Sequence, residues 1–297
     1  MQMFSRAARR RGFTLVELLA AITITAILAG VLIKGGMTVV GLASNVLITW
    51  EIAQLNDAVE DFAVYFGDYP PDFHDPAAAI QFMQAHFPKC PATNYPNFAL
   101  QNPSSALCFW LAGPSGQGFS TDPTNPFAAG GQRRIGPFIR FAPNRVQALG
   151  PLTQYFPPQI LHPAPYVYFR AGKKGYLGNC GYQAARPYRN SQNGQWINAD
   201  SFQILCAGQD GQFGAGNHFP AGDNYDKANL DDMANFSYGC TMAQAMRAGP
   251  SAIPPTPPAK QPAGKRPAEL KPPEPPQQRP SEQPPAEESA ANEPAEQ

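Results

Sequence analysis

The chain has 297 residues, with 22 lysines and arginines against 22 aspartates and glutamates, so its formal net charge is zero. This balance shows no basic excess of the kind that nucleic-acid binding needs, and we expect no nucleic-acid partner. Hydrophobic residues make up 43% of the sequence, as in a globular protein, whereas 34 prolines and 26 glycines predict many loops.

The N-terminus combines a basic stretch with a long apolar one. Four arginines lie within the first 11 residues, and the 21 residues from 13 to 33 carry a single charge, at Glu17. A helix of that length spans the hydrocarbon core of a bilayer. The positive-inside rule places the N-terminus in the cytoplasm, so everything after about Lys34 is expected outside the inner membrane, in the periplasm or beyond the cell.

The string Gly12-Phe13-Thr14-Leu15-Val16-Glu17 resembles the type III signal of type IV pilins and type II secretion pseudopilins. The resemblance implies that prepilin peptidase cleaves after Gly12 and that Phe13 becomes N-methylated. It also implies that helix 13–34 stays as the membrane anchor and filament core. The partners would be other pilin or pseudopilin subunits and the inner-membrane assembly platform.

Other N-terminal signals are weaker matches. An ordinary secretory signal could use Ala26-Ile27-Leu28-Ala29 as its cleavage region, and Arg10-Arg11 suggests a twin-arginine signal. Both fit poorly with a carboxylate at Glu17 inside the apolar run, and a plain signal anchor is the third alternative.

Glu17 is the candidate assembly residue. A carboxylate in a membrane segment costs about 2–3 kcal/mol unless it finds a partner. Cleavage would create a cationic amine at Phe13, one turn away, and the resemblance implies that the carboxylate of an incoming subunit meets the amine of the previous one. The alternative is a carboxylate that reaches the cytoplasmic headgroups.

Residues 35–69 are predicted to form an amphipathic stem helix packed on the head of the same chain, with a coiled-coil partner as the alternative. Its apolar positions recur every three or four residues, at Ile48, Ile52, Leu55, Val59, Phe62 and Phe66. Gly67 and the two prolines after Tyr69 end it, and the segment 65–70 resembles the helix exit of major pseudopilins. The glycines at 35, 36 and 41 either let the stem extend or bend during assembly, or permit close helix packing in the membrane.

Residues 70–248 are expected to form an extracytoplasmic α+β head, with the long N-terminal helix packed on an antiparallel sheet. Short helices are predicted over 76–87 and 104–112, and strands over 136–141, 166–170 and 201–207. The four histidines show no metal-ligand spacing, and the sequence contains no catalytic motif. We therefore expect no enzyme.

The polar segment from Gly208 to Phe236 resembles the C-terminal loop of major type II secretion pseudopilins, which binds calcium. The positions that match are Asp210, Asp231 and Asp232, and calcium takes six to eight hard oxygen ligands. The alternative is a solvated turn region, which Asp, Asn and Gly favour without metal.

Five cysteines lie in the expected head, at Cys90, Cys108, Cys180, Cys206 and Cys240. An oxidising compartment predicts one or two disulfides, with the pairing left open.

Residues 249–297 hold 15 of the 34 prolines and no aromatic residue, which predicts a disordered tail that serves as a spacer or a binding arm. The expected organisation is a cleaved leader (1–12), transmembrane helix (13–34), stem (35–69), head (70–248) and tail. The predicted function is a structural subunit of a type II secretion-like pseudopilus. Alternatives are a type IV pilus subunit, major or minor, and a membrane-anchored binding module.

Overall fold

The computed structural model describes residues 14–129, 133–158, 163–220, 225–237 and 239–248, with backbone alone for 31–40. The predicted leader, the cleavage site at Gly12 and Phe13, and the proline-rich tail therefore lie outside the described residues.

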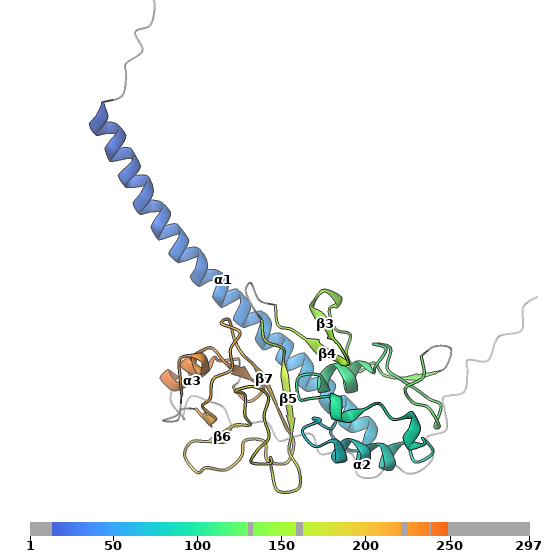
Figure 1. The fold of residues 1–297 in the computed structure, drawn as a ribbon. Coiled ribbons are helices and arrows are strands. Elements are labelled where there is room, and N and C mark those ends of the chain that lie inside the picture. The colour runs from blue at the N-terminus through green and yellow to red at the C-terminus, as the bar shows by residue number, and fades with distance from the viewer. Residues whose placement is uncertain (1–13, 130–132, 159–162, 221–224, 238, 249–297) are drawn as a thin grey trace, which may run out of the picture. The chain divides into compact units, whose positions relative to one another are not determined.

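One unbroken helix, α1 (Leu15–Phe66), contains the described parts of the predicted anchor and stem (Figure 1). It begins with a capping box, in which the backbone amide of Glu17 donates to Thr14 Oγ1 and the amide of Thr14 donates to Glu17 Oε2. It ends at Gly67, whose φ of 78° is left-handed and whose amide donates to the Ala63 carbonyl. The predicted stop at Gly67 is confirmed.

The glycines of the stem do not interrupt α1. Gly41 packs closely against a loop of the head, whereas the predicted close packing was with another helix in the membrane. Gln209 Nε2 donates to the Gly41 carbonyl at 2.6 Å, and a Cβ at Gly41 would lie only 2.8 Å from Gln209 Oε1. A larger residue at 41 would therefore displace the end of the Gln209 side chain.

The two ends of α1 have opposite surroundings. Near its start the apolar side chains are exposed, with Leu15 at 78% and Val16 at 75%, whereas Ile48 and Phe62 are fully buried in the head. No helix in the described part of the chain is both long and apolar enough to cross a membrane.

The central sheet has three antiparallel strands in the order β5 (Val167–Arg170), β7 (Phe202–Cys206) and β9 (Met233–Ala234). Alternate residues of β7 point to opposite faces. Ile204 belongs to the core that the sheet shares with α1, and Leu205 to a second core on the far side. The predicted α+β class and the strands near 166–170 and 201–207 are confirmed.

The other strands form two-stranded pairs. β1 (Phe119–Ser120) pairs with β2 (Arg134–Ile135) and β3 (Val146–Leu149) with β4 (Leu152–Tyr155), both antiparallel, while β6 (Arg189–Asn190) and β8 (His218–Phe219) are parallel. The strand predicted over 136–141 is wrong, because β2 ends before Gly136, whose φ is 76°, and Pro137 has no amide to donate.

Short helices fill the rest of the head. α2 (Pro76–His86) is as predicted, with Asp75 as its N-cap, and α3 (Met242–Ala248) follows the last strand. The helix predicted over 104–112 is a short segment that becomes a π-helix at Cys108–Ala112. Single 3₁₀ turns occupy Ala92–Asn94, Phe98–Leu100, Pro143–Arg145 and Ala228–Leu230.

The predicted disulfides are not formed, since all five cysteines are free. Four of them are buried, and burial in the apolar core raises the pKa of the Cys108 thiol to about 12. Cys206 is completely buried in β7. These thiols act as small apolar core residues rather than as cross-links.

Candidate assembly and cation-binding sites

Glu17 lies in the first turn of α1 and turns its carboxylate back toward the helix start. Glu17 Oε2 accepts the backbone amide of Thr14 at 2.9 Å and the Thr14 hydroxyl at 3.0 Å. Thr14 follows the predicted new N-terminus in the sequence. The carboxylate is thus held at the end of the helix where a cationic amine would be created, although Phe13 itself lies outside the described residues.

The three predicted aspartates of the C-terminal loop come together in one region. Asp231 Oδ2 accepts the backbone amides of Gln209 at 2.6 Å and Asp210 at 2.8 Å. Asp210 Oδ1 in turn accepts the amide of Gln212 at 2.8 Å. Partial burial raises the pKa of Asp210, and the carboxylates of Asp231 and Asp226 raise it further.

Asp232 is the most enclosed of the three, with 4% of its surface exposed. Its Oδ2 accepts the amide of Gly214 at 3.2 Å, and the side chains of Asn229 and Tyr188 donate at 3.4 and 3.5 Å. Its Oδ1 is buried and has no hydrogen-bond partner in the described residues. Burial, followed by the charges of Asp231 and Asp210, raises the pKa of Asp232 to about 8.

Asn229 organises the loop around these aspartates, although it was not among the predicted site residues. It is fully buried, and its Oδ1 accepts the amides of Gly216 at 2.9 Å and Asp226 at 3.2 Å. Its Nδ2 donates to the Gly216 carbonyl at 3.0 Å. Only the pattern Asp226-x-x-Asn229, a local turn cap, could have pointed to it.

The carboxylates of this region are ligands of the kind that calcium prefers, but their arrangement in this structure does not form a calcium site. The charges of Asp231 and Asp210 raise the pKa of Asp232, and one buried oxygen of Asp232 has no hydrogen-bond partner in the described residues. Carboxylate oxygens of this kind are ligands that calcium takes. However, no group of three or more His, Cys, Asp or Glu side chains within the described ranges is arranged to hold a metal ion. Asp210 and Asp231 instead accept backbone amides, the role that the turn alternative assigns to them.

A second buried carboxylate joins the stem to the head. Glu51, on α1, is 6% exposed and forms an ion pair with Arg145. Its Oε1 also accepts the Tyr155 hydroxyl at 3.0 Å, and its Oε2 accepts the Tyr166 hydroxyl at 2.8 Å. This cluster was not predicted, because in the sequence Glu51 is one of several polar residues on the outer face of an amphipathic helix.

The N-terminal segment matches a known family model. Residues 7–33 match the prokaryotic N-terminal methylation motif, and this span includes Gly12, Phe13 and Glu17. No curated protein and no solved structure matches the chain. The motif indicates a type IV pilin-like precursor that prepilin peptidase processes and that assembles with other pilin-like subunits. It covers a small part of the chain and leaves the head unmatched.

Proposed function

We propose that this chain is a structural subunit of a type II secretion-like pseudopilus. The observation that carries the proposal is the methylation motif at residues 7–33. From Leu15 onward this motif lies in α1, the same unbroken helix that contributes to the core of the head. In this proposal helix 13–34 is the inner-membrane anchor, with the N-terminus in the cytoplasm. The role is mechanical rather than catalytic: adding subunits at the membrane moves the heads outward.

Glu17 is the residue that would direct subunit addition. In the free chain its carboxylate caps its own helix through Thr14. In a filament the Phe13 amine of the preceding subunit would supply a cation in the same apolar surroundings, where an unpaired charge is strongly disfavoured. The Glu17 carboxylate would then leave Thr14 and pair with this amine. The pair would define the position of each subunit along the filament axis relative to the preceding one.

The C-terminal loop favours a pseudopilus over a type IV pilus in this proposal. The order of strand β7, polar loop and Asp231-Asp232 resembles the calcium loop of major pseudopilins. We propose Asp210, Asp231 and Asp232 as the ligands, on the basis of their proximity and the unpartnered Oδ1 of Asp232. Because Gln209 binds α1 at Gly41, a bound cation would also fix the loop on the stem.

Processing is tested by Gly12→Val, which should leave the leader attached because the peptidase must accommodate the side chain at the scissile bond. Gly30→Val is the matched control, since a Cβ at Gly30 would meet no atom within 4 Å. Mass spectrometry should find N-methylated Phe13 at the start of the wild-type and Gly30→Val chains. A mature wild-type chain that begins near Gly30 would indicate an ordinary signal peptidase and contradict the proposal.

Assembly is tested by Glu17→Ala, which should still insert and be cleaved but should yield few filaments in shear fractions. Thr14→Ala is the control, because it removes the hydroxyl cap, worth about 1 kcal/mol, and keeps the carboxylate. Normal filament yield from Glu17→Ala would contradict the pairing role.

The type of filament is tested in the cell that makes the protein. Deletion of the gene should abolish secretion of exported proteins and leave surface pili in place. Loss of pili with intact secretion would assign the chain to a type IV pilus instead.

A further inference from the structure

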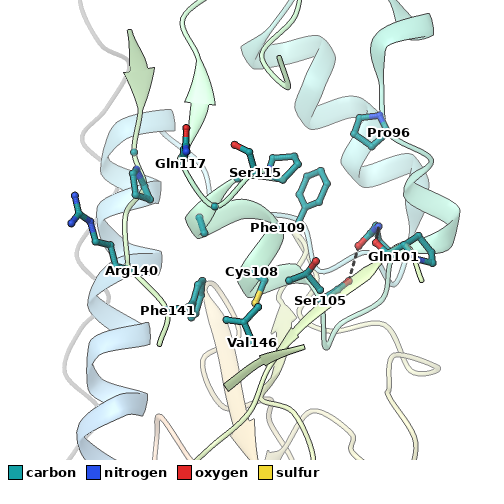
Figure 2. A pocket seen from close by; sticks show the side chains of 18 of the residues that line it. Pro96, Gln101, Ser105, Cys108, Phe109, Ser115, Gln117, Arg140, Phe141 and Val146 are labelled. Carbon is teal, nitrogen blue, oxygen red and sulfur yellow. Dashed lines mark hydrogen bonds between the residues drawn. The ribbon is translucent and has the colours of Figure 1, made fainter. Parts of the chain in front are cut away.

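A large cavity of the head has no role in the proposed function. Its volume is about 1050 Å³, and its walls come from two segments, residues 96–117 and 134–153. Figure 2 shows Phe109, Phe141 and Val146 around it, with Pro96 at one side. Five of its lining residues are prolines. The cavity walls are therefore mainly apolar and contain several rigid proline rings.

The charges that line this cavity are all of one sign. Arg134 and Arg140 are its charged residues, and no acidic side chain lines it within the described residues. The Arg134 guanidinium is fixed in the wall, since it donates to the Gln117, Ala128 and Gly118 carbonyls. Arg140 is exposed and forms no ion pair in the described part of the chain. A ligand with an apolar body and a carboxylate complements this surface.

We propose that this cavity binds an extended, proline-rich peptide that carries glutamates. The occupant is the segment 272–288 supplied by a second copy of this chain. That segment contains seven prolines, four glutamates and one arginine. Proline-rich peptides favour the polyproline II conformation, lose little entropy on binding and dock in grooves lined by aromatic residues. The glutamates match the cationic rim.

The second copy follows from the proposed function, on which this inference rests. Subunits of a filament present their tails to neighbouring heads at high local concentration. A tail held in the cavity of the next head would link the heads far from the helical core. The link would depend on salt, because the contact with Arg140 is exposed.

The binding experiment uses the purified full chain in detergent, with a photoreactive phenylalanine analogue in place of Leu100. Leu100 lines the cavity and is 52% exposed, so the substitution is tolerable. The probe is an isotope-labelled synthetic peptide with the sequence of residues 272–288. Illumination should give an adduct between position 100 and this peptide, in competition with unlabelled peptide.

Two variants separate a specific site from general attraction to positive charge. Arg140→Glu should weaken peptide capture about tenfold, because it reverses the charge at the rim. Arg133→Glu, which changes an exposed arginine outside the lining, should change capture less than about twofold. Both variants should melt at the wild-type temperature, which excludes unfolding as the cause.

The occupant is decided by two further measurements. In a mixture of light and heavy full chains, cross-links should join position 100 of one isotope to the tail of the other. The inference would be overturned if no adduct with the peptide formed, or if a peptide with alanine in place of every proline were captured equally well. Cross-links only within one molecule would overturn it too. Since the assay needs no filament, these outcomes do not depend on whether the subunit assembles as proposed.

Discussion

Two of the buried carboxylates have opposite surroundings, Glu51 at the stem and Asp232 beneath the C-terminal loop. Both oxygens of Glu51 are occupied, by Arg145 and by two tyrosine hydroxyls. Asp232 has neutral donors on one oxygen, no partner in the described residues on the other, and two further aspartates close by. The first carboxylate is neutralised within the fold, whereas the second needs a proton or a cation from outside.

The largest effect should come from removing the cation beside Glu51. Arg145→Ala should lower the free energy of unfolding by about 3 kcal/mol, because it leaves a buried carboxylate without its positive partner. Denaturant unfolding of the full chain in detergent, followed by circular dichroism, measures the loss. The double variant Glu51→Gln, Arg145→Met should regain most of it. If the single and double variants are equally unstable, packing stabilises the contact between stem and head, and the ion pair between Glu51 and Arg145 does not.

Calcium should act at the other carboxylate. At a hundredfold excess over its Kd it should stabilise the fold by about 2.7 kcal/mol, since it binds the folded state. Asp210→Ala should abolish this gain, and Asp200→Ala, an exposed aspartate outside the loop, should retain it. Thermal unfolding in calcium and in chelator makes the comparison. Identical curves for the wild type would remove the metal and leave a structural turn.

Without calcium, pH should reveal the cost of ionising Asp232. Its pKa is raised from 3.8 to about 8 in the folded state, so the fold prefers the protonated form. The contribution of Asp232 to stability is therefore fully present below about pH 4 and is lost as the pH rises toward 8. Asp232→Asn should gain stability relative to the wild type over this window, by about 1–2 kcal/mol at pH 8. Parallel pH profiles would show that Asp232 is not enclosed.

The smallest effect concerns the contact between the C-terminal loop and α1. Gln209→Ala removes hydrogen bonds to Gly41 and Asn45 and should cost about 0.5–1 kcal/mol. Faster amide hydrogen exchange in residues 209–212 should report it. Gln212→Ala, an exposed side chain in the same turn, is the control. Equal exchange in the two variants would mean that the loop does not depend on the stem.

Sequence patterns within short segments predicted the helices and strands that form within those segments. The stop of α1 at Gly67, helix α2 and strands β5 and β7 all follow from periodicity and turn residues. The Glu51 cluster could not be predicted in this way, because its partners lie 94 to 115 residues further along the chain. The disulfides were predicted from compartment alone, which says nothing about burial in the core.

The site residues divide similarly. Gly12, Phe13 and Glu17 lie in a contiguous motif that the sequence displays directly. The surroundings of Asp232 depend on Asn229 and Tyr188, which reach it only after the loop has folded. A pattern of aspartates therefore indicated the region but not the unpartnered oxygen that distinguishes Asp232 from its neighbours.

The unbroken helix through residues 35–41 has a consequence for how the subunit bears load. The head contacts α1 from Gly41 onward, so in the proposed filament a pull between the membrane anchor and the head would act on the turns just before that point. Three glycines weaken the helix here by about 1 kcal/mol each. Unwinding these seven residues would lengthen the stem by about 13 Å, from 1.5 to roughly 3.3 Å per residue. The proposed subunit would thus lengthen by unwinding of this segment.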